Sequence, residues 1–393
     1  MKIASLRAFR VQIPFKKKFK HSLRERSSTD NIIIEMRLKD GTVGYGEGLP
    51  RDYVTGETPE GVLAALEQLP KELFKWDFNT LEALLAFLDE EILSRKNFPH
   101  EKENNTARCV LELSFLDAYC KSLKKTFFDV TRLTLQDLTG FKKARVLYYD
   151  GVLSLDSWIP TVVSALKMKF FGFRRLKLKV SSDIEATVQM VDQVRKIVGN
   201  KIDLRIDANG AWTLDEACGI SQCLVPYSIS CIEQPLAHRD VSQTQEFRKR
   251  TQIPIMIDES LSSMEDARFA VEHKCCDLFN IRLSKCGGFI NSLRLALFAR
   301  QQGIGYQLGC MVGETAILSA AGRHFATYDP QLCYLEGSFD RYLLKDNMAS
   351  RDMSFSWGGK ALPVEGYGLG VEIDNQKLKR YAVYENLIYE SHA

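Results

Sequence analysis

The chain has 393 residues, which is more than one ordinary domain, so we expect two domains, one of them large. Hydrophobic residues make up 45% and charged residues 26%, as in average globular proteins, which argues against bulk disorder. The net charge of +3 is small for this length and argues against a nucleic-acid binder or an acidic solvating protein.

The N-terminal stretch, residues 1–15, has no apolar region of the kind that a signal peptide needs, and no run of about 18 apolar residues predicts a membrane span. The ten cysteines show neither a CxxC pair nor a zinc-type spacing with histidine, so we expect buried, reduced thiols in a cytoplasmic protein. The basic run at residues 15–21 is more typical of a charged surface loop than of a nucleic-acid patch.

About the first 130 residues have the pattern of an α+β unit. Residues 31–47 predict two strands joined by a hairpin turn at Asp40-Gly41. Residues 58–96 and 105–124 predict helices, because their apolar residues recur at three-to-four spacing. We therefore expect an N-terminal α+β domain over residues 1–130.

After this unit, short apolar strands alternate with amphipathic helical stretches, which is typical of a parallel sheet. Eight such units in about 200 residues predict a (β/α)₈ barrel of the TIM type over residues 131–345. The Gly-rich remainder, residues 346–393, does not continue the alternation, and we expect it to pack back on the first domain. The eight expected strands are residues 144–152, 174–180, 203–209, 229–235, 254–260, 278–285, 304–310 and 333–338.

The second of these strands carries two lysines on one face. Leu176, Leu178 and Val180 alternate with Lys177 and Lys179, and successive side chains of a strand point to opposite faces. The apolar residues suit the face that meets the helices of a barrel. Both lysines are therefore expected to point inward.

Each of the next four predicted strands ends in a charged residue after an apolar run: Asp207, Glu233, Asp258 and Lys285. From Lys179 onward these residues recur at intervals of about one strand–helix unit, which places them at equivalent heights on neighbouring strands. Active sites of such barrels lie at the carboxyl ends of the strands. We therefore expect these five side chains to form one site.

Three carboxylates on adjacent strand ends would repel one another, and a hard cation with oxygen ligands relieves this repulsion, so we expect Mg²⁺ there. The alternative is that each acid caps a helix or pairs with an arginine. Lys179 on the second strand and Lys285 on the sixth would face each other across the site, as an acid/base pair approaching one carbon from both sides. Lys177 would lower the pKa of Lys179 and bind an anionic substrate group, and the metal would stabilise an enolate oxygen.

At these residues the chain resembles the enolase superfamily, specifically its muconate lactonizing enzyme subgroup. The motifs that carry the resemblance are 177-KLK-179, 207-DAN-209, 233-EQP-235, 258-DES-260 and 285-KCGG-288, with 44-GYGEGLPRDYVTGET-58 in an N-terminal capping domain. The resemblance covers nearly the whole chain.

The resemblance implies a set of roles, by position. Asp207, Glu233 and Asp258 would bind one Mg²⁺, with Mn²⁺ as a possible substitute, and Lys179 and Lys285 would be the acid/base pair. Lys177 would assist at the substrate carboxylate, and Arg24, on a mobile capping loop at about residues 15–30, either binds a distal anionic group or is a plain surface arginine. Asn209 and Glu259 would contact the metal ligands and hold them in position without binding the metal themselves.

The subgroup includes several overall reactions, and the loop 22–31 together with 337-GSFD-340 looks most like dipeptide epimerases. Those usually carry Asp-x-Asp at the eighth strand to hold the substrate's α-ammonium, whereas this chain has Tyr334-Leu335-Glu336. Glu336 either still binds an amine or is a helix-capping acid. Asp150, on the first strand, is either another cation partner or a strand-end acid that faces solvent.

The leading hypothesis is Mg²⁺-dependent abstraction of a proton α to a carboxylate through an enediolate, for racemisation or epimerisation of an amino-acid derivative or dipeptide. A second is a lyase of the same scaffold, either a dehydratase or an o-succinylbenzoate synthase, or a muconate-type cycloisomerase. A third is a non-catalytic barrel. The expected partner is a small-molecule carboxylate, with neither nucleic acid nor membrane involved, and homo-oligomers are expected from the family resemblance.

Overall fold

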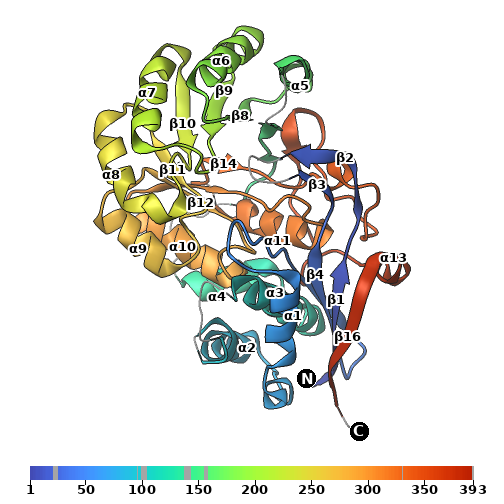
Figure 1. Ribbon diagram of the computed structural model, residues 1–393. Helices are drawn as coiled ribbons and strands as arrows, with labels where there is room; N and C mark the ends of the chain where they lie inside the picture. The colour runs from blue at the N-terminus through green and yellow to red at the C-terminus, as the bar shows by residue number, and fades with distance from the viewer. Residues whose placement is uncertain are drawn as a thin grey trace.

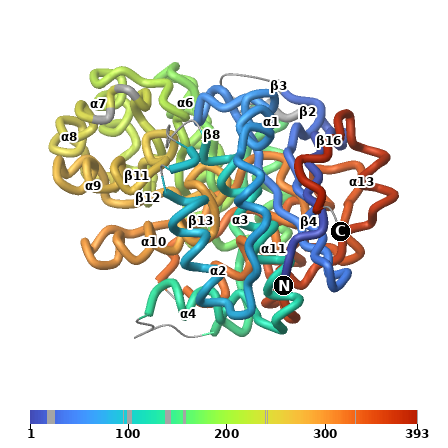
Figure 2. The backbone as a smooth tube through the Cα atoms, turned by 90° about the horizontal axis from the view of Figure 1, so that it is seen from below, coloured from blue at the N-terminus to red at the C-terminus, as the bar shows by residue number. Residues whose placement is uncertain are grey.

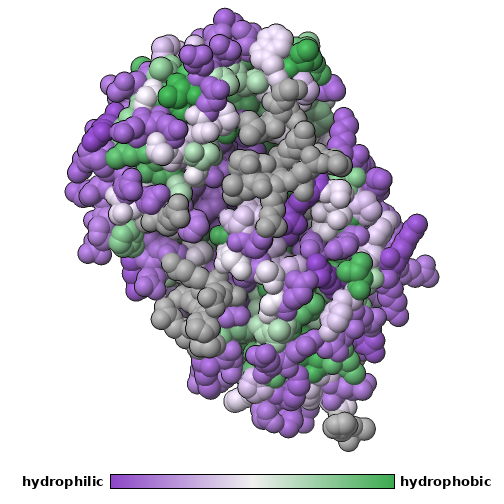
Figure 3. Space-filling view, in the orientation of Figure 1, coloured by the Kyte–Doolittle hydropathy of each residue, from purple (hydrophilic) through white to green (hydrophobic). Residues whose placement is uncertain are grey.

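The computed structural model describes residues 1–20, 25–94, 96–98, 104–136, 143–154, 158–329 and 331–391. Figure 1 shows two parts: strands ringed by helices, green to orange, and a second part in which N-terminal and C-terminal strands lie together. Polar residues cover most of the face seen in Figure 3. Within the described ranges no helix combines the length and the apolar character that crossing a bilayer requires.

The second part is built on an antiparallel sheet with the strand order β16-β1-β4-β5. Ala8 on β1 pairs with Ile34 on β4, which pairs in turn with Gly46 on β5. The last strand, β16, pairs with β1, and Figure 2 shows these two ends of the chain side by side. The strands are β1 (Ile3–Val11), β4 (Asn31–Leu38), β5 (Val43–Gly48) and β16 (Ala382–Glu390), and a separate hairpin consists of β2 (Pro14–Lys20) and β3 (Glu25–Ser28).

A helix packs very closely on this sheet. A Cβ atom added at Gly46 of β5 would lie 1.9 Å from the carbonyl oxygen of Val110 on α3, so only glycine permits the approach. Nearly all of α3 is buried, as expected for a helix between the sheet and the barrel. The helices of this part are α1 (Pro59–Glu67), α2 (Leu81–Phe87), α3 (Asn105–Ser122) and α4 (Phe127–Leu135), with short helical turns at Lys71–Phe74 and Leu88–Leu93.

The barrel is one parallel sheet whose eight strands follow the order of the sequence from β7 to β14. The N–H of Asp150, before β7, donates to the carbonyl of Leu335 on β14 (2.8 Å), which links the first strand to the last. The strands are β7 (Gly151–Leu153), β8 (Arg175–Lys179), β9 (Asp203–Asp207), β10 (Ile229–Glu233), β11 (Ile255–Ile257), β12 (Leu278–Ile281), β13 (Gly305–Leu308) and β14 (Tyr334–Leu335). The predicted TIM-type barrel with an α+β capping domain is confirmed.

One α-helix follows each strand from β7 to β13 in the described chain, whereas β14 is followed by the four-residue helix α12 (Asp340–Leu343). The barrel helices are α5 (Trp158–Phe170), α6 (Ile184–Val198), α7 (Leu214–Leu224), α8 (Val241–Arg250), α9 (Met264–Glu272), α10 (Phe289–Gln301) and α11 (Ala316–Thr327). The remaining elements are β6 (Leu147–Tyr148), which pairs with β15 (Lys360–Ala361), the short turns Val225–Tyr227, His238–Asp240 and Trp357–Gly359, and α13 (Asn375–Tyr381). The domain bounds at residues 130 and 345 stay a prediction.

Candidate active site

Three wholly buried carboxylates lie at the ends of three neighbouring barrel strands. Asp207 ends β9, Glu233 ends β10, and Asp258 directly follows β11. The sheet register pairs Lys179 with Asp207 and Asp207 with Glu233, so these side chains start from one layer of the barrel. All three carboxylate residues are 0% exposed. The structure thus brings these acids together at one end of the barrel.

The two lysines of β8 point into the barrel and contact these carboxylates. Lys177 Nζ lies 3.1 Å from Glu233 Oε2 and 3.6 Å from Asp207 Oδ2. Lys179 Nζ donates to Asp207 Oδ2 (3.1 Å) and to Asn209 Oδ1 (2.6 Å). Asn209 also donates its backbone N–H to Asp207 Oδ1 (3.0 Å), so it holds the carboxylate and the lysine together.

Lys285 lies beyond the end of β12, in a loop that ends with Gly287 and Gly288. Its Nζ donates to Asp258 Oδ1 (2.8 Å) and to the carbonyl of Asn280 (2.9 Å), and it also contacts the carbonyl of Asp258. Gly288 has a φ of 114°, and a Cβ atom there would lie 2.3 Å from Glu112 Oε2, so only glycine fits. The glycines after Lys285 therefore serve the loop that brings its amine into the barrel.

The capping domain holds this loop from the other side. Asn105 Nδ2 on α3 donates to the carbonyl of Lys285 (2.6 Å). The carboxyl group of Glu112, also on α3, accepts the N–H groups of Phe289 (2.7 Å) and Ile290 (2.8 Å), which begin α10. The oxygens of this group thereby satisfy N–H groups at the helix N-terminus that have no partner within the helix. The position of Lys285 thus depends on both domains.

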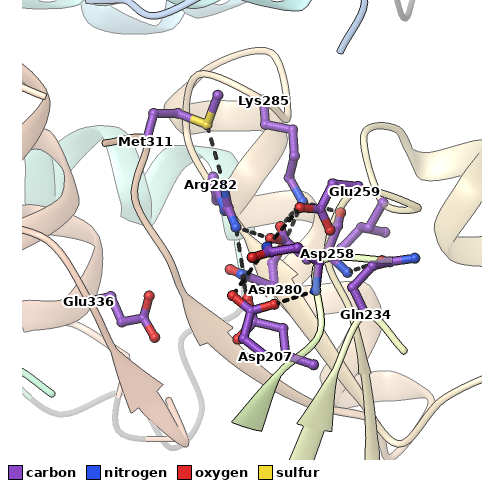
Figure 4. Close-up of polar contacts among 12 residues, drawn as sticks. Asp207, Gln234, Asp258, Glu259, Asn280, Arg282, Lys285, Met311 and Glu336 are labelled. Carbon is purple, nitrogen blue, oxygen red and sulfur yellow. Dashed lines mark hydrogen bonds and ion pairs between the residues drawn. The ribbon is translucent and has the colours of Figure 1, made fainter. Parts of the chain in front are cut away.

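Arg282 is a largely buried cation that the sequence analysis did not place in the site. Its Nη2 contacts Asp258 Oδ2 and lies 3.8 Å from Glu233 Oε1, and its Nη1 lies 3.7 Å from Met311 Sδ. Figure 4 shows the guanidinium directed at the carboxylates, with Lys285 approaching Asp258 from another side. Cationic side chains therefore lie between the carboxylates in this structure.

Among the described residues, no three acidic, cysteine or histidine side chains are arranged so that they could hold a metal ion together. The donor set nevertheless fits a hard divalent cation, since the three carboxylates are buried at neighbouring strand ends. In addition, Glu259 Oε2 is a buried oxygen without a hydrogen-bond partner in the described chain, while its Oε1 accepts from Asn209 Nδ2 (3.3 Å). Binding a cation would require the guanidinium of Arg282 to leave Asp258.

Burial disfavours every charge in this site, and neighbouring charges decide the direction in which each pKa moves. Burial lowers the pKa of Lys285 to about 8. Burial also favours the neutral form of Lys177, but the carboxylates of Glu233 and Glu336 outweigh it and raise the pKa of Lys177. Burial opposes ionisation of Asp207, yet the two β8 lysines outweigh it and lower the pKa of that carboxyl. Lys285 is therefore the more easily deprotonated amine of these two lysines.

Glu336 follows β14, and Asp150 precedes β7; both acids are paired with cations. Glu336 Oε2 accepts from Lys177 Nζ (2.8 Å), and its Oε1 accepts from Arg205 Nη2 (3.1 Å). Asp150 Oδ2 accepts from Arg205 Nη2 (2.9 Å), and its Oδ1 lies 2.6 Å from Arg175 Nε. Asp150 is 1% exposed, so the interpretation that it faces solvent is wrong, and the cations beside it are arginines of the protein itself.

Sequence reasoning assigned no role to four polar residues of the site: Arg205, Gln234, Asn280 and Arg282. Asn280 Nδ2 donates to Glu233 Oε1 (2.8 Å), and Gln234 Oε1 accepts the N–H of Asp258 (2.8 Å). A signal for Arg205, Asn280 and Arg282 existed, because each alternates with apolar residues along its strand. Arg24 lies outside the described residues, so its contact with a distal anion stays a prediction.

Comparisons with known proteins match the chain over most of its length. The profile of the family described as "Enolase C-terminal domain-like" matches residues 162–377. The chain is 29% identical to the hydrophobic dipeptide epimerase of Enterococcus faecalis, covering 96% of each chain. It is 28% identical to the N-succinyl-L-Arg/Lys racemase of Bacillus cereus, covering 99% of this chain and 100% of that one. The crystal structure of a dipeptide epimerase from Enterococcus faecalis, complexed with Mg and L-Leu-L-Tyr, matches with a TM-score of 0.83 and 26% identity over 95% of this chain and 100% of that one.

Proposed function

Because the chain belongs to the enolase superfamily, we propose that it is an Mg²⁺-dependent isomerase that racemises or epimerises an amino-acid derivative or a dipeptide. The reaction centre would be the carbon next to a carboxylate. Relatives named as dipeptide epimerases and as an N-succinyl-L-Arg/Lys racemase, similar over nearly the whole chain, support this reaction class.

In this proposal Lys179 and Lys285 are the acid/base pair. One neutral amine takes the proton from the α carbon and leaves an enediolate, and the other lysine, as an ammonium, gives a proton to the opposite face. Lys179 ends β8, and Lys285 follows β12, which lies four strands further round an eight-stranded sheet. This separation supports opposed positions for the two amines. The lowered pKa of Lys285 supports its use as a base near neutral pH.

Asp207, Glu233 and Asp258 would hold the Mg²⁺, for which Mn²⁺ would be a substitute. When bound, the cation supplies positive charge beside the substrate carboxylate, where negative charge develops in the transition state. Lys177 would bind the same carboxylate, because the acids around it keep its amine protonated. Asn209 would hold Asp207 and Lys179 in position through the hydrogen bonds described above, with Glu259 and Gln234 as further supports.

The observation that carries the proposal is that two lysines from distant strands, Lys179 and Lys285, each contact one member of a group of three wholly buried carboxylates. Burying so many charges costs desolvation energy that a well-packed apolar core of the same volume would avoid. A barrel with only a structural role gains nothing from this arrangement. The site therefore argues against the non-catalytic hypothesis.

The proposal is tested by deuterium uptake. The protein is incubated with Mg²⁺ in D₂O and a pool of dipeptides and N-acylamino acids, and masses and chirality are read for each member. We expect one member or more to gain one mass unit and to appear as both epimers. A product that has lost water, without an α-epimer, would instead identify a lyase and refute the isomerase proposal.

Further parts of the proposal concern the metal, the location of the protein and its partners. Mn²⁺ should replace Mg²⁺, since it also accepts carboxylate ligands. The protein is predicted to be a cytoplasmic homo-oligomer without nucleic-acid or membrane partners. Light scattering of the purified chain tests the oligomeric state, and a monomer would refute that part alone.

A further inference from the structure

A cavity of about 390 Å³ lies over the lysines of β8. Lys177, Lys179 and Arg282 line it where it meets the site, and it extends toward residues that follow β14 and precede β8. A substrate whose α carbon reaches Lys179 would place its remaining bulk in this cavity. The lining of the cavity therefore selects the substrate.

Aromatic side chains gathered round Phe355 form one wall of the cavity. The ring of Phe355 lies 5.5 Å from that of Phe173, 5.2 Å from that of Phe339 and 4.9 Å from that of Tyr342, and Phe171 completes the group at 6.3 Å. The hydroxyl of Tyr342 donates to the carbonyl of Phe355 (2.9 Å), so its polar atom is already bonded. This aromatic wall suits an apolar group of about the size of a phenyl ring.

Two acidic residues line the cavity among the described residues, Glu336 and Glu314, and both are engaged. The carboxylate of Glu336 lies between the buried cations Lys177 and Arg205, one on each oxygen. Glu314 Oε1 accepts the N–H of Met311 (2.7 Å), and burial raises the pKa of Glu314 to about 8, so it is mostly neutral at pH 7. Neither acid offers a free carboxylate to an ammonium group of a substrate.

The cations that line the cavity outnumber these acids. They are Arg51, Lys167, Lys177, Lys179 and Arg282. Arg51 donates to backbone carbonyls, including those of Pro50 (2.7 Å) and Val312 (2.9 Å), so its guanidinium holds the wall rather than a ligand. Lys177, Lys179 and Arg282 are in turn paired with buried carboxylates, so a positive group on the substrate would find these acids already bonded to cations of the protein.

Building on the proposed function, we infer that the substrate is an amino acid whose α-nitrogen carries an uncharged, largely apolar acyl group, and that dipeptides with a free N-terminal ammonium are poor substrates. The acyl group would lie on the aromatic wall. The ammonium of an aminoacyl group would have to be desolvated beside Glu336, whose two oxygens are already bonded to Lys177 and Arg205.

A matched set of substrates tests this inference on the full wild-type chain with Mg²⁺. The reacting residue is L-leucine, L-glutamate or L-lysine, each carrying a propionyl, L-alanyl, 3-phenylpropionyl, L-phenylalanyl or succinyl group. Propionyl and L-alanyl differ only in the ammonium, and so do 3-phenylpropionyl and L-phenylalanyl. We expect kcat/KM for α-deuterium uptake to fall at least tenfold when the ammonium is present, and to rise about tenfold with the phenyl ring.

The outcomes separate the two proposals. If the aminoacyl or succinyl compounds exchange as fast as the 3-phenylpropionyl ones, the inference is overturned and the proposed function stands. If no member of the set or of the earlier pool exchanges, the proposed function fails and the inference falls with it. Phe339→Ala should lower the ratio of 3-phenylpropionyl to propionyl activity about tenfold. The control Phe269→Ala, on α9, removes an exposed ring that stacks on His273 and should keep the wild-type ratio.

Discussion

Replacing Lys285 by methionine tests the two-lysine mechanism most directly. Methionine keeps much of the length and apolar stem of lysine but cannot transfer a proton. The variant should fold, because Asp258 keeps its contact with Arg282 and is not left as a lone buried charge. The contacts of the amine with Asp258 and Asn280 are lost at about 1.5–3 kcal/mol for each charged hydrogen bond, and this cost is offset in part because no ammonium has to be buried.

The effect on catalysis is measured separately from this loss of stability. Proton transfer by a positioned side chain contributes about 10²–10⁴-fold to a rate, so racemisation by Lys285→Met should fall by that factor. Deuterium exchange at the α carbon, without inversion of configuration, should persist for the enantiomer whose α-hydrogen faces Lys179. In Lys179→Met the opposite enantiomer should be the one that exchanges.

The assay incubates each enantiomer separately in D₂O and follows mass and chirality together. The control variant Lys196→Met removes an exposed ammonium that pairs with Asp192 on α6, and it should behave as wild type. Racemisation by Lys285→Met within about threefold of wild type would refute the assignment of Lys285 to proton transfer.

Three further predictions concern the metal and the domain interface. Chelation of divalent ions should abolish deuterium uptake, and Mg²⁺ or Mn²⁺ should restore it; activity that survives chelation would exclude a metal requirement. Arg282→Met should tighten Mg²⁺ binding at least tenfold in calorimetry, because the cation no longer competes with a guanidinium for Asp258; unchanged affinity would show that the two do not compete. Burial raises the pKa of Glu112 from 4.5 to about 8, so its contribution to stability is complete below pH 4.5 and is lost as the pH rises through 8. Denaturation at pH 5 and pH 8 should therefore show a loss on the order of 4 kcal/mol that Glu112→Gln lacks, and an equal loss in both proteins would contradict this reasoning.

Much of the barrel could be predicted because its strands are short apolar runs at regular spacing. The expected strand over residues 203–209 corresponds to β9 (Asp203–Asp207), and the alternation of Lys177 and Lys179 with leucines correctly predicted that both point inward. The same alternation would have placed Arg205 on the inward face, but no chemical reason singled it out. The first strand is the least accurate, since residues 144–152 contain β6 and only the start of β7.

Contacts between distant segments could not be predicted from local patterns. The engagement of Glu336 by Lys177 and Arg205 depends on where three separate strands end. The contact of Arg282 with Asp258 depends on side-chain rotamers at the centre of the barrel, for which sequence spacing has no signal. Local patterns therefore identify which residues face inward, and only the folded chain shows how their charges are shared.

The hydrogen bonds between α3 and the loop that carries Lys285 limit how the domains of such enzymes can be exchanged, in engineering or in evolution. Asn105 donates a hydrogen bond to the carbonyl of Lys285, and Glu112 accepts hydrogen bonds from the N–H groups at the start of α10. A barrel grafted onto a foreign N-terminal domain would lose these partners even with every inward-facing residue intact. We therefore expect chimaeras to retain proton-transfer activity only when α3 and the loop after β12 come from the same parent. The two segments should therefore be inherited together.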